Sequence, residues 1–294
     1  MQLFTTAEAA AYLRLKERKI YEMVAEGTVP CTKVTGRWLF PKAELDHWLA
    51  SSVSRPEGVT RPDPAPIVSG SHDPLLEWAL RESGSGLATL APGSEAGLSR
   101  FSAGETVAAA IHLHALEDVN ADANVATLRD RNDLYDVVMI AFCRREQGFL
   151  AAPGNPLKLE SIDEIKKRRA RIGMRPKGAG AQLLLLALLH QAAISLDQLS
   201  TVTPVCPTGP DVAQAIRAGR ADTGIATRAV ANAAGLDFIP ITWEPFDLVM
   251  HQRDYFRPPL QALLGFMHAQ ELASRARELG GYDLGAAGSV RFVN

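Results

Sequence analysis

Residues 51–66 read SSVSRPEGVTRPDPAP, a stretch that is rich in serine and proline and poor in large apolar side chains. Proline cannot continue a helix, and it biases the residue before it toward extended backbone. A segment of this kind adds little to a core, so it divides the chain into two separately folded parts. We predict a first domain over residues 1–52, a linker over residues 53–66 and a second domain over residues 67–294.

The bulk composition is that of an ordinary globular protein of about two domains. Of the 294 residues, 47% are hydrophobic and 22% are charged, and the net charge of −2 excludes binding of a polyanion through bulk charge. The first 52 residues carry seven Lys/Arg against six Asp/Glu, so any DNA contact must depend on where the basic residues lie.

The sequence also indicates the compartment. No apolar run approaches the roughly 18 residues that span a membrane, and the first ten residues do not read as a secretory signal. Cys31, Cys143 and Cys206 are widely spaced without the spacing of zinc ligands, which favours reduced thiols. We expect a cytoplasmic protein with no membrane partner, and a buried structural thiol at Cys143.

The first domain is predicted to hold three helices and a hairpin. Thr5 or Thr6 can cap the first helix, and Glu8 stands three residues after Thr5, which is the spacing of a capping box. A second helix is expected over residues 17–26, followed by a hairpin over residues 33–40. This order is typical of a helix-turn-helix module with a wing.

Basic residues in this domain lie where they can contact DNA. The second helix exposes basic and aromatic side chains in its N-terminal half, the part that can enter a major groove. The hairpin is an arm that can reach phosphates or the minor groove. The candidate DNA contacts are Thr6, Lys16, Arg18, Lys19, Tyr21, Lys33 and Arg37. The alternative is a small helical adaptor whose basic residues form a solvated face.

Residues 3–49 resemble the excisionase-type, MerR-related winged helix-turn-helix family over nearly their whole length. The matching residues are Thr6, Glu8, Ala9, Ala10, Leu13, Ile20, Tyr21, Gly27, Pro30, Gly36, Arg37, Phe40, Leu45, Trp48 and Leu49. The resemblance implies that residues 17–26 form the recognition helix and residues 31–40 the wing.

The second domain alternates short apolar runs with helical stretches, which predicts α/β units and a largely parallel sheet. Strands are expected at residues 66–69, 86–90, 107–113, 134–143, 149–151, 171–174, 201–205, 223–226, 238–241 and 247–251. Helices are expected at residues 74–82, 94–103, 162–167, 179–192, 210–218, 228–234 and 258–279. A domain of this length fits two lobes better than one sheet, and the long last helix is expected to pack on its own lobe.

Four loops of this domain share one design, in which small residues follow an apolar strand and open a helix. A helix N-terminus offers free N–H groups and a positive dipole end, so such loops suit an anion. In open α/β sheets these loops gather at the carboxyl edge of the strands. The candidate ligand contacts are Ser69, Ser71, His72, Ser94, His112, Gly178, Ala179, Gly180, Ala181, Gln182, Thr208 and Gly209. The alternative is that these residues only make tight turns.

The second domain also resembles the periplasmic-binding-protein-like family, whose members are often molybdate-binding-protein-like and fused behind a DNA-binding module. The resemblance rests on SGSHDPLL, AAIHL, RREQGFLAAPGNP, the Gly-Ala-Gly loop, AGRADTGIATRA and GLDFIPITWEPFDLVM. It implies a type II fold with two α/β lobes, two hinge crossings near residues 142–149 and 239–249, and a ligand cleft. The first lobe would hold residues 67–145 and 240–294, and the second residues 146–239.

One loop departs from that family. Where its members carry a Gly-Ser-Gly-Thr-like pattern, this chain has Ala179 and Ala181, so hydroxyl donors for an oxyanion are lost. The ligand is therefore expected to be either an oxyanion such as molybdate or tungstate, or a small organic acid, and no cofactor is expected.

The sequence indicates no catalytic or metal centre. Ser71, His72 and Asp73 are neighbours in sequence and cannot form a triad, which needs convergence in space. His112 and His114 lack a third metal ligand in the sequence pattern. We therefore expect a protein that is not an enzyme.

Together these features predict a ligand-responsive one-component transcription regulator. We expect a homodimer, because two-fold operators favour dimers. Closure of the two lobes on an anion would then alter the geometry of that dimer. The alternative is a cytoplasmic accessory protein that handles molybdate or a cofactor and whose N-terminal module binds protein.

Overall fold

The computed structural model describes residues 2–52, 63–118 and 122–294. The chain forms two compact units, Met1–Pro62 and Asp63–Asn294. Most of the predicted linker, residues 53–62, lies outside the described residues. The last two residues of that prediction do not belong to a linker, because they begin strand β4 (Ala65–Gly70).

The N-terminal unit is a three-helix module with a small sheet. Its elements are β1 (Leu3–Phe4), α1 (Thr6–Leu13), α2 (Glu17–Glu26), β2 (Thr32–Val34), β3 (Arg37–Pro41) and α3 (Lys42–Ser51). The strands pair antiparallel in the order β1-β3-β2. Thr5 caps α1 and exchanges hydrogen bonds with Glu8, so the predicted capping box is confirmed. Ala9, Ile20 and Phe40 are fully buried at the centre of this unit.

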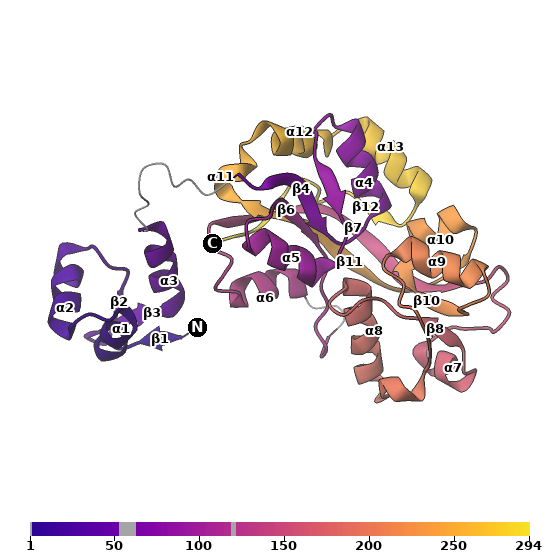
Figure 1. Ribbon diagram of the computed structural model, residues 1–294, viewed down its shortest axis with the longest axis horizontal. Coiled ribbons are helices and arrows are strands. Elements are labelled where there is room, and N and C mark those ends of the chain that lie inside the picture. The colour runs from indigo at the N-terminus through magenta and orange to yellow at the C-terminus, as the bar shows by residue number, and fades with distance from the viewer. Residues whose placement is uncertain (1, 53–62, 119–121) are drawn as a thin grey trace. The chain divides into compact units, whose positions relative to one another are not determined.

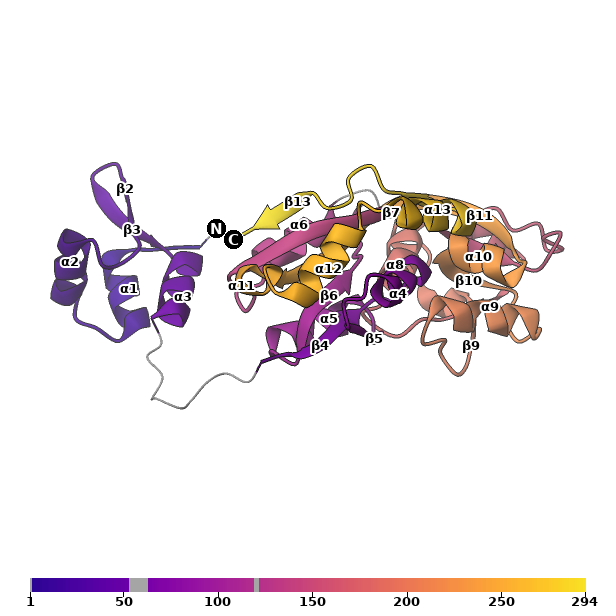
Figure 2. The same cartoon turned by 90° about the horizontal axis from the view of Figure 1, so that it is seen from above.

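A single mixed sheet runs through the second unit in the order β5-β4-β6-β11-β7-β10-β8-β9. At its centre two 15-residue strands, β7 (Val137–Ala151) and β11 (Asp237–His251), pair antiparallel (Figures 1 and 2). One half of the sheet adds β4, β5 (Ala88–Leu90) and β6 (Thr106–Ile111), and the other adds β8 (Arg171–Gly173), β9 (Ser200–Val202) and β10 (Thr223–Thr227).

This arrangement confirms a two-lobed α/β fold and corrects the expectation that the sheet is largely parallel. Parallel pairs occur within each lobe, between β4 and its neighbours β5 and β6 and between β8 and its neighbours β9 and β10. The centre is antiparallel. The expected short strands at residues 134–143 and 149–151 are one strand, as are those at 238–241 and 247–251, because polar residues that interrupt the apolar pattern lie inside continuous strands.

Helices cover both faces of each half of the sheet. Around the first half lie α4 (Pro74–Glu82), α5 (Ser94–Ser102), α6 (Ala123–Asp130), α11 (Gln252–Tyr255), α12 (Pro258–Phe266) and α13 (Gln270–Leu279). Around the second half lie α7 (Ile162–Lys167), α8 (Gly180–Gln191), α9 (Gly209–Arg217) and α10 (Arg228–Ala234). No helix within the described ranges is long and apolar enough to cross a membrane.

Strand periodicity explains the two cores of the first lobe. Ala108 and Ala110 of β6 pack toward α4, α12 and α13, whereas Ala109 and Ile111 pack toward α5 and α6. Successive side chains of a strand point to opposite faces, so a strand that is apolar at every position serves both layers. Cys143 lies in the first of these cores as a buried free thiol, as predicted.

The expected helix over residues 258–279 is two helices, α12 and α13. Leu260, Leu263 and Met267 bury one face of α12 at helical spacing. The next buried residue, Leu272, follows after five positions, which is out of phase with a continuous helix. A break before α13 restores the apolar face, and both helices pack on the core of their own lobe.

The sequence did not predict two short C-terminal strands. β12 (Tyr282–Asp283) and β13 (Val290–Val293) both pair antiparallel with β7. They return the end of the chain to the first lobe, where the Tyr282 hydroxyl donates to Asp73.

Helix α5 approaches the turn after β4 so closely that Gly97 has no room for a side chain. An added Cβ would lie 2.3 Å from Gly70 Cα and 2.6 Å from Gly70 N, both backbone atoms. We expect Gly97→Ala to lower the free energy of unfolding by about 1–3 kcal/mol, because the helix must shift. Urea unfolding followed by tryptophan fluorescence measures this.

Gly265→Ala is the matched control for that substitution. Gly265 lies in α12 with nothing within 4 Å of the added Cβ. Alanine there should leave stability unchanged or raise it by up to about 1 kcal/mol. Equal destabilisation by both substitutions would contradict the close-packing argument.

Candidate functional site

The N-terminal unit carries most of the predicted DNA contacts on α2 and the β2–β3 hairpin and one of them, Thr6, on α1. In α2 the side chains of Arg18 and Lys19 are 91% and 50% exposed, and both lie within ion-pair distance of Glu22. Tyr21 is also exposed, and Lys16 is the N-cap residue. On the hairpin, Arg37 is exposed and the Lys33 ammonium lies 5.1 Å from the centre of the Trp38 ring. Thr6, at the first position of α1, is half-buried.

In the second unit the middle of the two long strands is polar and buried. Register pairs Arg145 of β7 directly with Glu244 of β11, and the Arg145 Nε donates to Glu244 Oε1 over 2.7 Å. Gln147 Nε2 donates to the same oxygen over 2.9 Å. Both partners in the ion pair are almost completely buried.

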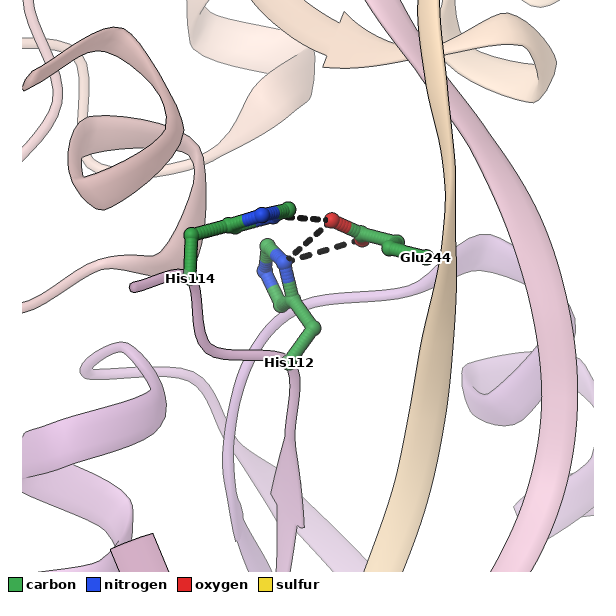
Figure 3. A group of neighbouring side chains, drawn as sticks. All are labelled: His112, His114 and Glu244. Carbon is green, nitrogen blue, oxygen red and sulfur yellow. Dashed lines mark hydrogen bonds and ion pairs between the residues drawn. The ribbon is translucent and has the colours of Figure 1, made fainter. Parts of the chain in front are cut away.

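Two histidines contact the same carboxylate. His112 Nδ1 lies 2.9 Å from each oxygen of Glu244, and His114 Nε2 lies 2.8 Å from Oε2. Figure 3 shows both imidazoles pointing at the carboxylate from the segment that follows β6. β11 pairs antiparallel with β6, with Asp247 opposite Ile111, so Glu244 and the two histidines lie just beyond the paired residues of the two strands. The strand pairing therefore explains how residues about 130 positions apart meet.

Arg145 joins this cluster to the start of α4. Its guanidinium donates to Asp73 Oδ2 over 2.8 Å and lies 4.0 Å from the centre of the Phe246 ring. Asp73 is also the N-cap of α4 and accepts from the backbone N–H groups of Leu75 and Leu76. The charge of Arg145 is thus balanced by two carboxylates.

Burial and charge set the protonation of these groups. Burial would raise the pKa of Glu244, but His112 and Arg145 outweigh it and hold that pKa well below its usual value. Burial lowers the pKa of His112 to about 4, against the opposing effect of Glu244. Glu244 is therefore ionised and His112 neutral at neutral pH.

A cavity of about 10 Å³, space for roughly one water molecule, lies beside this cluster. Its walls come from both lobes and from the long strand β7: Ser71, His72, His112, Arg145, Gln147, Arg175, Gly209, Ala226, Thr227 and Val230. Gln147 Oε1 is buried and has no hydrogen-bond partner among the described residues.

Arg175 differs from Arg145 because its charge is not paired. Its Nε and one terminal N–H donate to the carbonyl oxygens of Cys206 and Pro207, each over 3.0 Å. Burial and the neighbouring Arg145 lower the pKa of Arg175 to about 10. Within the part of the chain that the structure describes, no carboxylate lies within ion-pair distance of it. The cavity therefore contains one uncompensated cation.

A larger groove of about 660 Å³ shares two wall residues with the cavity. It lies between α4 of the first lobe and α9 and α10 of the second, and His72 and Val230 line both spaces. Its walls are mostly apolar, with alanines and prolines from both lobes, and its polar groups include Glu77, Gln214 and Arg217. Its size falls within the range of small-molecule sites.

The structure places the predicted ligand residues in three different settings. Ser71, His72, His112 and Gly209 line the cavity. The hydroxyls of Ser69, Ser94 and Thr208 instead hold the fold together. Ser69 bonds to Gly97 O and Thr106, Ser94 bonds to the His112 backbone, and Thr208 bonds to Asp211 in a capping box.

The glycine-rich loop packs against the other lobe and does not line the cavity. Glu95 N donates to Gly178 O over 3.2 Å, and Ala179 lies against Gly93. A Cβ on Gly180 would lie 2.2 Å from the His112 carbonyl oxygen, so only glycine allows this approach. Ala181 is buried in the core of the second lobe, and Gln182 accepts from the Arg175 backbone N–H.

Sequence reasoning missed four residues of this site: Arg145, Gln147, Arg175 and Glu244. For Arg145, Gln147 and Glu244 the available signal was the placement of charged and amide residues inside long apolar stretches, in RREQ and WEPF, whereas Arg175 carries no such signal. Buried charges are rare unless they are paired, so such interruptions mark polar sites.

The fold and this cleft define a two-lobed binding domain behind a small helix-turn-helix unit. Comparison with known families agrees: the model described as "PBP superfamily domain" matches residues 76–268, and the one described as "Helix-turn-helix domain" matches residues 3–52. The chain therefore belongs to the PBP superfamily and carries an N-terminal helix-turn-helix domain. Both resemblances drawn from the sequence are confirmed.

Individual relatives extend the comparison. The uncharacterized protein YvgK of Bacillus subtilis (strain 168) is 22% identical over 305 residues, which cover 98% of this chain and 97% of that protein. A putative phosphate transporter substrate-binding protein of Clostridium perfringens, solved with bound phosphate, has a TM-score of 0.54 at 9% identity, covering 74% of this chain and 98% of its own. The tungstate transporter protein of Geobacter sulfurreducens has a TM-score of 0.51 at 13% identity, covering 72% and 97%. The two solved structures share the fold.

The buried carboxyl of Asp247, three residues after Glu244, provides a test of pH dependence. Burial raises its pKa from 3.8 to about 6, although Arg291 and Asn124 contact it. The folded state therefore holds a proton that the unfolded state releases, and its stabilising effect grows as the pH falls through 6 and is complete below about 4.

We expect Asp247→Asn to remove this gain. Between pH 7 and pH 4 the free energy of unfolding of the natural protein should rise relative to the variant by roughly 3 kcal/mol, for a shift of about two pKa units. Urea unfolding across this range measures it, with exposed Asp237→Asn as the control. Parallel pH profiles for the natural protein and Asp247→Asn would contradict the argument.

Proposed function

We propose that this protein is a ligand-responsive, DNA-binding transcription regulator. The N-terminal unit would bind DNA through α2 and the β2–β3 hairpin, and the cleft of the second unit would bind a small organic anion. The observation that carries the ligand proposal is Arg175, a cation that has no carboxylate partner among the described residues and lines a cavity that shares wall residues with an apolar groove. Both matched domains are binding modules, and we assign no catalytic step.

Three features favour an organic anion over a bare oxyanion such as molybdate or tungstate. The cavity of about 10 Å³ is too small for a tetrahedral oxyanion with the lobes as they lie. The adjoining groove offers about 660 Å³ with mostly apolar walls, which suits a carbon body. The unpartnered Gln147 Oε1 needs a donor, such as a hydroxyl group. A hydroxy acid or a phosphate ester meets these requirements together.

The same contacts supply a route from ligand to DNA. The lobes meet where the loop from Gly178 to Gly180 packs on Gly93, Glu95 and His112. A ligand that binds both lobes more tightly when these contacts form would shift the protein toward the closed state. In a cytoplasmic homodimer, closure would change the spacing of two helix-turn-helix units and so the fit to a two-fold operator.

The second candidate is a cytoplasmic accessory binding protein whose N-terminal unit contacts a protein. The exposed basic residues of α2 and the hairpin favour DNA. Because phosphate contacts release counterions, a DNA affinity that falls steeply with salt distinguishes the two functions.

We expect the double substitution Arg18→Ala and Lys19→Ala to weaken binding to the DNA upstream of its own coding sequence by about tenfold or more. It should also reduce the salt dependence of that affinity, because phosphate or base contacts are lost. Fluorescence anisotropy at several salt concentrations measures both effects.

Lys167→Ala with Arg168→Ala is a matched control for DNA binding. Lys167 and Arg168 pair with Glu164 of α7 as Arg18 and Lys19 pair with Glu22 of α2. The two double substitutions therefore remove the same charge from the protein. DNA binding that is equally weakened by both pairs, or by neither, would overturn the assignment of α2.

A thermal-shift screen would compare carboxylates and phosphate esters with sulfate, molybdate and tungstate. We expect some of the carboxylates or phosphate esters to raise the melting temperature of the protein. Arg175→Gln should weaken the best of them by roughly 10- to 100-fold, because a charge-assisted hydrogen bond is lost. Arg171→Gln, at an exposed arginine already paired with Asp222, is the control. Stabilisation by the inorganic oxyanions alone would refute the organic ligand, and an unchanged affinity in Arg175→Gln would refute the role of Arg175.

A further inference from the structure

The cluster of His112, His114 and Glu244 has a second chemical capacity besides hydrogen bonding. We propose that these three side chains bind a divalent transition-metal ion of the zinc class, through His112 Nδ1, His114 Nε2 and Glu244 Oε2. The three residues offer ligand atoms that all lie within 4.8 Å of one another. The sequence offered no third ligand for the two histidines, and the fold supplies it from β11.

The spacing of the ligand atoms is close to that of a metal site. Each imidazole nitrogen lies 2.8–2.9 Å from Glu244 Oε2. Around a tetrahedral ion with bonds of about 2.0–2.1 Å, ligand atoms lie roughly 3.3 Å apart. The two nitrogen-to-carboxylate distances would therefore lengthen by about half an ångström around the ion, and the two imidazole nitrogens lie within 4.8 Å of each other. The two imidazole rings are nearly perpendicular, at 86°, and approach the carboxylate from different directions.

The surrounding residues hold the ligands as outer-shell partners do in metal sites. Arg145 and Gln147 both donate to Glu244 Oε1, which fixes the carboxylate, while both histidine nitrogens lie within 2.9 Å of Oε2. Ser94 bonds to the backbone N–H and C=O of His112, and Gly180 packs against its ring. The site is thus preorganised before any ion arrives.

Charge and donor type select the class of ion. Two carboxylates, Asp73 and Glu244, face the single guanidinium of Arg145, so the cluster has one more acidic than basic charged partner to offer a cation. Two imidazoles and one carboxylate suit Zn²⁺, Co²⁺ or Ni²⁺, whereas Ca²⁺ and Mg²⁺ require oxygen ligands.

The test titrates the metal-free, full-length protein with Co²⁺ and Zn²⁺, without any added anion. We expect one equivalent of Co²⁺ to produce the visible d–d absorption of a four-coordinate nitrogen and oxygen site, and Zn²⁺ to displace it. Mg²⁺ and Ca²⁺ should not compete. Because no anion is present, the outcome does not depend on the proposed ligand of the cleft.

Three variants distinguish metal binding at this site from metal binding by other histidines. His114→Gln keeps an N–H toward Glu244 but removes the imidazole, and it should weaken Co²⁺ binding by about 100-fold or more. Gln147→Ala removes an outer-shell partner and should weaken it by about tenfold. The exposed His190→Ala is the control and should bind as the natural protein does.

The proposal is overturned if the natural protein takes up no Co²⁺ or Zn²⁺, or if His114→Gln binds Co²⁺ as tightly as the natural protein. Far-ultraviolet circular dichroism of each metal-free variant shows that it is folded. Should His114→Gln fail to fold, Glu244→Gln serves as the second variant, because its amide keeps the shape and one acceptor but removes the anionic ligand.

Discussion

The buried carboxylate of Glu244 is the interaction on which the centre of the second unit depends. A charge at this depth is stable only when it is paired and hydrogen-bonded. Four side chains meet that need: His112, His114, Arg145 and Gln147. They come from β7 and from the segment after β6, so one side chain of β11 holds its neighbours on both sides. Removing one partner from a buried pair typically costs about 3–5 kcal/mol, because the other charge is left uncompensated.

The two strands that carry this cluster also join the lobes. The ends of β7 and β11 are apolar and enter the cores of both lobes, whereas their middle is polar and forms the floor of the cleft. The proposed anion site and the proposed metal site share this floor, since His112 contacts Glu244 and lines the cavity. The polar residues therefore lie where two lobes must bend and where a ligand must be held.

The sequence predicted part of the cleft from its small-residue loops. Ser71, His72 and Gly209 were found this way, because a loop that opens a helix has a local signature. Arg145 and Glu244 lie inside strands, where periodicity predicts only that a side chain faces one side or the other. The glycines at 178 and 180 were interpreted as an anion cradle, but the structure uses them for close contact between lobes, which no local pattern distinguishes.

The sequence by itself determined where most helices and many strands lie and that a helix-turn-helix module precedes a two-lobed domain, although it divided the two long strands and missed β12 and β13. Capping residues, turns and apolar periodicity act over a few positions, so they can be read without the fold. Only the tertiary structure decided which residues meet. Glu244 reaches His114 because β11 pairs with β6 in one register, and that register depends on how the whole sheet assembles. Arg175 is likewise an ordinary arginine in the sequence, and we propose it as a binding group only because the fold places it in the cleft without a carboxylate partner among the described residues.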